Sequence, residues 1–70
     1  MPEAIEQLHE ALRLNPNNAE THNNFGLALL ASGNARESIQ EFEMALRLNP
    51  ELKSAADNLR RAQAQWGSQR

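Results

Sequence analysis

The side chains that could do acid–base or metal chemistry in this chain are two histidines and nine carboxylates. His9 and His22 lie on separate segments, whereas a metal site needs several ligands that converge at close range. We therefore interpret His22 as a packed side chain at the edge of a core and His9 as a solvated one. Glu37, Glu41 and Glu43 crowd one segment, but no nucleophile elbow or Gly-rich phosphate loop accompanies them. We expect no enzyme activity, no cofactor and no bound metal.

The balance of charge argues against a dedicated nucleic-acid binder, because such a protein needs a basic face and the net charge here is −2. Residues 1–52 carry eight acidic and three basic side chains, whereas residues 53–70 carry four basic and one acidic. This polarity is either incidental or steers a contact, with an acidic ligand or head to tail between copies. A weaker hypothesis is contact with an anionic surface through four cations: Lys53, Arg60, Arg61 and Arg70.

The hydropathy pattern favours a soluble chain. The longest apolar run covers residues 27–31, far short of the ~20 residues that span a bilayer. The N-terminal residues are acidic where a signal peptide would be basic, and the absence of cysteine excludes a disulfide framework. We expect a cytoplasmic rather than a secreted protein, with no membrane partner.

An internal repeat organises the chain. The hexapeptide Ala-Leu-Arg-Leu-Asn-Pro occurs at residues 11–16 and returns unchanged at residues 45–50, an offset of 34 residues. The same register aligns Glu3 with Glu37. Periods of this length are typical of helical repeat arrays.

Apolar residues at spacings of three and four predict four helices, at residues 3–14, 19–32, 35–48 and 51–66. Pro16 and Pro50 end the first and third helices, because proline lacks an amide donor and disfavours helical geometry in the preceding residue. Asn18 is expected to cap the second helix, and Gly33 to adopt a positive φ in the turn after it. Asn34 is expected to open the third helix with a capping box.

Residues 19–52 resemble a tetratricopeptide repeat. The pattern of that family is Trp-x2-Leu-Gly-x2-Tyr, followed by Ala-x3-Phe and then Pro. The corresponding residues are, in order, His22, Phe25, Gly26, Leu29, Ser38, Phe42 and Pro50. Departures occur at His22, Leu29 and Ser38. The resemblance implies an all-α fold, a fragment of a solenoid built from four antiparallel helices joined as helix-turn-helix pairs.

The resemblance also implies one domain, residues 1–70, in an unusual phase. Its parts are the second helix of a partial repeat (1–18), a full repeat (19–52), a C-terminal capping helix (53–66) and a tail (67–70). Arg60 stands where Gly26 stands in the full repeat, which indicates that regular stacking ends at the last helix. Because such helices cannot bury their apolar faces alone, one flank of the first helix is expected to stay open.

Members of this family bind extended peptides or helices in a concave groove, which implies an interaction scaffold for a protein or peptide. By register, its lining would be Glu20, Asn23, Asn24, Leu27, Leu30, Ala31, Ser54, Asp57, Asn58, Arg61 and Gln65. Asn24 and Asn58 occupy the place where the family often keeps an asparagine that bonds a peptide backbone. Alternatively, these are ordinary solvated side chains. The lysines with which some members clamp a terminal carboxylate are not matched, so we do not expect that clamp.

Self-association is the alternative function. The open flank either belongs to a fragment of a longer array or meets a second copy, with exchange of identical hairpins as one route to a homo-oligomer. Candidate contact residues are Ile5, Leu8, Leu12 and Trp66. Trp66 either folds against its own core or anchors this interface, where tryptophan is enriched.

Overall fold

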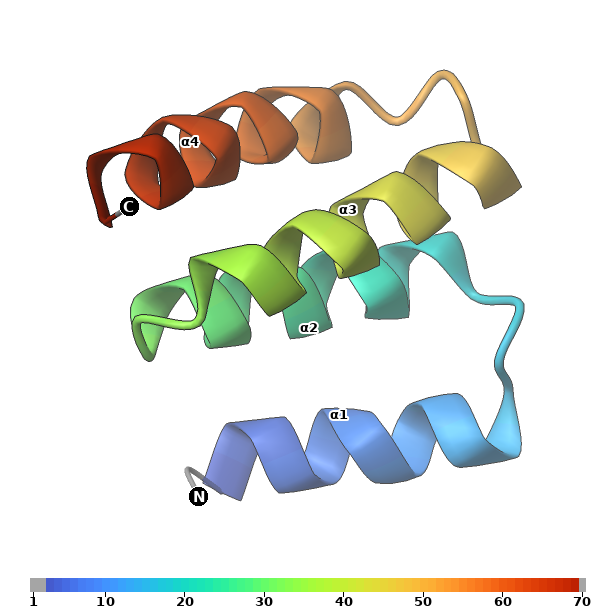
Figure 1. Cartoon of the computed structure of the whole chain (residues 1–70). Coiled ribbons are helices and arrows are strands. Elements are labelled where there is room, and N and C mark those ends of the chain that lie inside the picture. The colour runs from blue at the N-terminus through green and yellow to red at the C-terminus, as the bar shows by residue number, and fades with distance from the viewer. Residues whose placement is uncertain (1–2, 70) are drawn as a thin grey trace.

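The computed structural model describes residues 3–69, which form four α-helices. They are α1 (Glu3–Leu14), α2 (Ala19–Ala31), α3 (Ala35–Leu48) and α4 (Lys53–Gln69). Consecutive helices run antiparallel (Figure 1). Residues 3–69 contain no strand, so the predicted all-α fold with four helices is confirmed.

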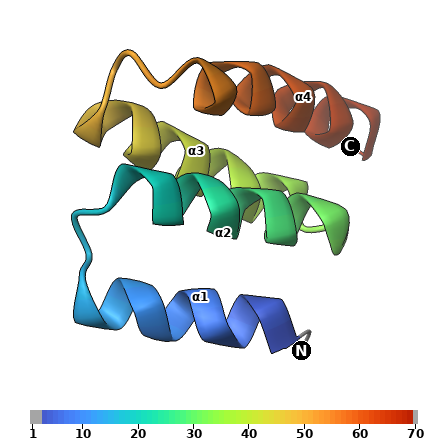
Figure 2. The same cartoon turned by 180° about the vertical axis from the view of Figure 1, so that it is seen from behind.

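The helices do not pack evenly on one another. α2 and α3 form the most extensive pair, and α4 packs on α3 and also reaches α2. α1 packs on α2 alone and stands apart from the other two helices, as both views show (Figures 1 and 2). The molecule is therefore a three-helix unit with one outlying helix.

Two apolar clusters hold these elements together. The larger one joins α2, α3 and α4 through buried Leu30, Ala35, Phe42 and Ala62, with Ile39, Leu59 and Trp66 packed against them. The second joins α1 to α2 through buried Ile5, Phe25 and Leu29, with Leu8, Leu12 and Ala28 packed against them. α2 contributes to both clusters, which makes it the central helix of the fold.

Gly26 permits the close approach of α2 and α3. A Cβ atom at this position would lie 2.7 Å from Cδ1 and 2.8 Å from Cζ of the Phe42 ring. Phe42 is completely buried, so its ring has little room to move away. Only glycine therefore fits at this helix crossing. The register-equivalent Arg60 has an exposed side chain on α4.

The predicted turn chemistry is confirmed at two positions and wrong at a third. Asn18 Oδ1 accepts a hydrogen bond from the Thr21 amide at 3.1 Å and so caps α2. Gly33 has a φ of +85°, in the turn between α2 and α3. Asn34 makes no side-chain cap hydrogen bond, because its backbone (φ −97°, ψ 62°) is not extended as that geometry requires.

The last helix differs from its predicted bounds. It begins at Lys53 rather than at residue 51, because the amides of Ala55 and Ala56 bond to the Leu52 carbonyl and start the first turn there. It continues through Gly67 to Gln69 instead of ending at residue 66. The predicted tail at residues 67–70 is thus helical as far as Gln69, and Arg70 lies outside the described residues.

Candidate functional site

The predicted groove residues meet on α2 and α4, which lie against each other. A surface cavity of about 330 Å³ opens between the two helices, lined by Leu27, Leu30, Ala31, Arg61 and Gln65. All five belong to the predicted lining. Leu27 is 38 % exposed, so the groove has an apolar side chain open to solvent. We name this cavity the α2–α4 groove.

Two asparagines of the predicted groove take part in a buried hydrogen-bond network. Asn23 Nδ2 donates to Ser54 Oγ at 3.1 Å, and Asn58 Nδ2 donates to Asn23 Oδ1 at 3.1 Å. Both amides are only 7 % exposed, and Arg61 donates to Asn58 Oδ1 at 3.5 Å. Asn23 and Asn58 therefore hold α2 to α4, and neither offers a ligand a full set of free hydrogen-bonding groups. Asn24 is exposed and remains free to do so.

The remaining polar residues of the predicted lining, Glu20 and Asp57, are exposed. Asp57 Oδ1 accepts a hydrogen bond from the exposed Arg60 one turn along α4, a pair that contributes little in water. Arg61 is the one cation that lines the α2–α4 groove. The groove thus combines an apolar surface with a single positive charge, which suits an apolar side chain followed by an acidic group.

The residues predicted for self-association mostly face inward. Ile5 is buried, and Leu8 and Leu12 pack with it against α2. Trp66 is half-buried against the larger apolar cluster, as expected if it folds onto its own core. The outward side of α1 instead carries Ala4, Ala11 and Leu14, and the last of these is 71 % exposed.

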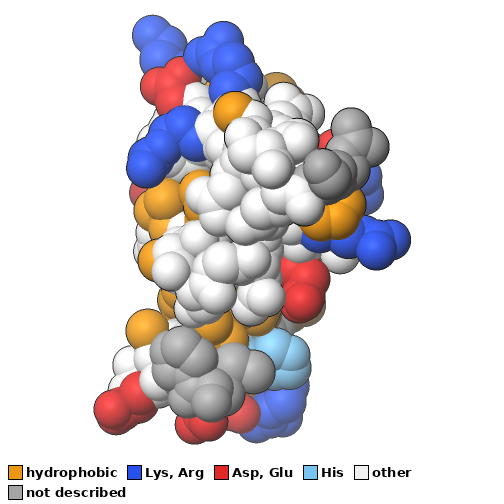
Figure 3. Space-filling model, turned by 60° about the vertical axis from the view of Figure 1, so that its left-hand side comes forward, with side chains coloured by type: hydrophobic (Ala, Val, Ile, Leu, Met, Phe, Trp, Pro, Cys, Tyr) orange, Lys and Arg blue, Asp and Glu red, His pale blue; other side chains and the backbone are white. Residues whose placement is uncertain are grey.

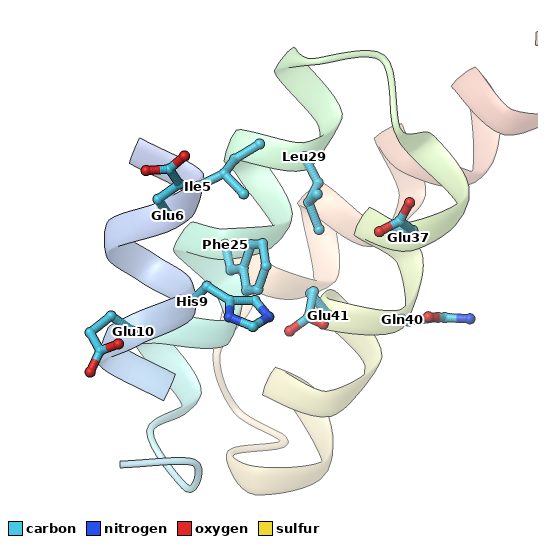
Figure 4. A pocket seen from close by; sticks show the side chains of 9 residues that line it. All are labelled: Ile5, Glu6, His9, Glu10, Phe25, Leu29, Glu37, Gln40 and Glu41. Carbon is cyan, nitrogen blue, oxygen red and sulfur yellow. The ribbon is translucent and has the colours of Figure 1, made fainter. Parts of the chain in front are cut away.

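A second cavity, which the sequence did not predict, lies between α1 and α3. Its volume is about 520 Å³, and we name it the α1–α3 cleft. Its lining is Ile5, Glu6, His9 and Glu10 from α1, Phe25 and Leu29 from α2, and Glu37, Gln40 and Glu41 from α3 (Figure 4). The apolar periodicity of each helix could be predicted from the sequence. The distance between α1 and α3, which are not consecutive in the sequence, could not.

His22 links three segments next to this cleft. Its Nδ1 lies 2.8 Å from Glu41 Oε1 on α3, and its Nε2 lies 2.8 Å from the carbonyl oxygen of Pro16 in the α1–α2 turn. Which ring nitrogen donates depends on the tautomer of His22. His22 is thus a packed structural side chain, in agreement with its interpretation from the sequence. His9 is exposed, with its ring edge-on to Phe25 at 5.8 Å between centroids.

The charges are unevenly spread over the surface. Figure 3 shows Lys and Arg side chains gathered at the α4 end and carboxylates lining the α1 end, with exceptions at both ends. On α1, a hydrogen bond from Arg13 to Glu10 raises the pKa of the exposed Arg13 guanidinium. Among residues 3–69, no three His, Cys, Asp or Glu side chains are grouped so that they could hold a metal ion.

None of the helices in the described part of the chain is both long and apolar enough to cross a membrane. In a comparison with known families, residues 1–33 match a family model described as TPR repeat. The matched segment covers α1 and α2, whereas the sequence analysis placed the complete repeat at residues 19–52. No curated protein matches the chain. This match over residues 1–33 agrees with the resemblance to the tetratricopeptide repeat family that the sequence indicated.

Proposed function

From this resemblance to the tetratricopeptide repeat family, we propose that the chain is a scaffold that binds a peptide or helix of a partner protein in the α2–α4 groove. Domains of this family generally mediate protein–protein interaction and are generally non-catalytic. The main support for placing the binding site in this groove is its cavity of about 330 Å³. The partly exposed side chain of Leu27 lies on one wall and Arg61 lies on the other.

The groove favours a partner segment that pairs an apolar side chain with a carboxylate. Leu27 and Ala31 offer exposed apolar surface, and burying it releases about 25 cal/mol per Å². Arg61 can form a charge-assisted bond to an acidic group at the edge of that surface. The exposed amide of Asn24 can bond the backbone of an extended segment. Asn58 contributes by keeping α2 and α4 at a fixed spacing rather than by touching the partner.

A selection of random peptides on the immobilised chain tests this site. We expect the selected peptides to pair apolar and acidic residues, to lose most of their affinity for Leu27→Gln, and to bind Arg61→Gln roughly tenfold more weakly. Gln63→Ala is the matched control, because Gln63 is exposed on α4 and does not line the groove. Peptides that bind all three variants as well as the native chain would exclude the α2–α4 groove.

Self-association is a second candidate, favoured by the outward side of α1. Ala4 and Ala11 are exposed there, whereas Ser38 and Ala45, their counterparts 34 residues later, are completely buried by a neighbouring helix. A helix of a second copy could cover this side in the same way that α2 covers α3. Leu14 would then lie in the contact.

Light scattering over a roughly hundredfold concentration range tests this candidate. Self-association predicts a stable multiple of the 7.9 kDa chain, which Leu14→Glu converts to a monomer with unchanged helicity. Gln63→Glu adds the same charge at an exposed position on α4, away from α1, and is the control. A 7.9 kDa species at every concentration would exclude this candidate.

A further inference from the structure

The α1–α3 cleft is separate from the α2–α4 groove and shares no residue with it. It exists because α1 packs on α2 but makes no close backbone contact with α3. α2 therefore forms the floor between two walls that stand apart. The lining residues of α1 run from Ile5 to Glu10, a length of about 7 Å along the helix axis. A cleft of this length admits one or two side chains rather than a whole helix.

The floor of the cleft is apolar and partly aromatic. Ile5, Phe25 and Leu29 form its base, all three of them buried in the α1–α2 cluster. The exposed ring of His9 stands edge-on to Phe25, with an angle of 80° between the two planes. Figure 4 shows the two rings together in the middle of the cleft, with Leu29 beside them. An aliphatic chain or a planar cation can pack against such a surface.

The walls of the cleft carry only one sign of fixed charge. Glu6 lies on α1, Glu37 and Glu41 lie on α3, and no Lys or Arg is among the lining residues. Glu10 also belongs to the lining but points outward (Figure 4) and bonds to Arg13. Because Glu10 is paired with Arg13 and points away, the negative potential that attracts a cation to the cleft comes from Glu6, Glu37 and Glu41.

Two of these carboxylates have no partner in the described part of the chain. Glu41 is bonded to His22, which fixes its position at the α3 wall. Glu6 and Glu37 make neither a hydrogen bond nor an ion pair with any residue between 3 and 69. Glu6 on α1 and Glu37 on α3 belong to opposite walls of the cleft (Figure 4). A cation between them would satisfy both and would remove their mutual repulsion.

We propose that the α1–α3 cleft is a second docking site, which receives an arginine from a cationic segment of a partner protein. The aliphatic part of the arginine packs on Leu29 and Phe25, and its planar guanidinium bonds to the carboxylates of Glu37 and Glu6. Arginine fits better than lysine because its fork of donors can serve two carboxylates and its plane can stack on a ring. The site does not depend on the α2–α4 groove. That groove contains Arg61 and favours an acidic partner group, whereas this cleft favours a cationic one.

The experiment is a titration of the isotope-labelled chain with the peptide acetyl-Ala-Arg-Leu-Arg-Ala-amide, followed by amide NMR shifts. We expect shifts confined to α1, α2 and α3 around His9, Phe25 and Glu37. Raising the ionic strength from about 0.01 M to about 0.15 M shortens the Debye length from ~30 to ~8 Å and should weaken binding markedly. The same peptide with citrulline in place of both arginines keeps the shape without the charge and should not bind.

Matched variants locate the site. Glu6→Gln combined with Glu37→Gln should weaken the arginine peptide roughly tenfold, because the main charge-assisted bonds are lost. Glu43→Gln combined with Glu51→Gln removes the same number of charges at exposed positions outside the cleft and should have little effect. Leu27→Gln, which alters the α2–α4 groove, should leave this binding intact even if the proposed function fails. Neither Glu6 nor Glu37 is buried, so their double variant is expected to fold.

Three results would overturn the assignment. Equal binding of the citrulline peptide would remove the electrostatic basis of the site. Equal losses of affinity with the control pair Glu43→Gln and Glu51→Gln and with the pair Glu6→Gln and Glu37→Gln would show that only net charge matters. Self-association at low salt that Glu37→Gln abolishes would show that a second copy, through its exposed Arg60, fills the cleft instead of another protein.

Discussion

The two helix junctions related by the 34-residue repeat differ in how they pack. α1 on α2 corresponds to α3 on α4, yet the second contact is much closer (Figure 1). The repeated hexapeptide makes the contrast measurable, because its residues are identical in both places. Ala45 is completely buried and Ala11 is exposed, and Leu48 is 37 % exposed where Leu14 is 71 % exposed.

Neighbours, rather than local sequence, decide this difference. α3 lies between α2 and α4, whereas α1 has α2 as its one neighbour in the structure. A helix with two neighbours can bury two faces, and a helix with one neighbour can bury only one. The space beside α1 is the α1–α3 cleft, so the looser junction is also the one that leaves a cavity.

The largest expected contrast concerns Phe42 and Leu8, which occupy matching positions on α3 and α1. Phe42 is completely buried, so Phe42→Ala should lower the free energy of unfolding by about 3–5 kcal/mol. Leu8 is half-buried, so Leu8→Ala should cost only about 1 kcal/mol. Urea denaturation followed by helical circular dichroism measures both. Equal costs would show that the two junctions are packed equally well.

A smaller and cleaner contrast uses the two copies of one alanine. Ala45→Leu must force a larger side chain between helices and should cost about 1–3 kcal/mol. Ala11→Leu adds the same atoms on the open side of α1 and should be nearly neutral. The midpoints of urea denaturation compare them directly. A clear loss of stability in Ala11→Leu would mean that the outward side of α1 is already covered.

The smallest contrast concerns the turns. Asn18 caps α2 through its side chain, so Asn18→Ala should cost about 1 kcal/mol. Asn34 begins α3 without such a bond, so Asn34→Ala should cost no more than a few tenths. Thermal unfolding in parallel samples resolves the difference. If the two substitutions cost the same, the side-chain cap of α2 would add no stability over the uncapped start of α3.

The helices and most turns could be predicted from the sequence because their causes are local. Pro16 and Gly33 act within a few residues of their own positions, and the apolar spacing marks each helix, although α4 extends to Gln69, beyond its predicted end. Asn34 shows the limit, since its residue type suits a cap but its backbone after the tight turn does not. Residue type alone does not report φ and ψ.

The lining of the α2–α4 groove was also predictable, because a register of 34 residues carries positions from one helix to the next. The bond between Asn23 and Asn58 was missed because it depends on the distance between α2 and α4. The α1–α3 cleft was missed for the same kind of reason: it depends on a helix contact that does not form. Sequence periodicity describes the faces of helices and says little about the gaps between them.

Native-state hydrogen exchange tests the difference between the two junctions most directly. The amides of residues 12–14 and 46–48 have identical chemical neighbours, so their intrinsic exchange rates are the same and any difference reports structure alone. The account predicts that residues 46–48 exchange at or near the rate of global unfolding and that residues 12–14 exchange much faster through local opening of α1. Equal protection in the two copies would contradict it, because α1 would then be held as firmly as α3.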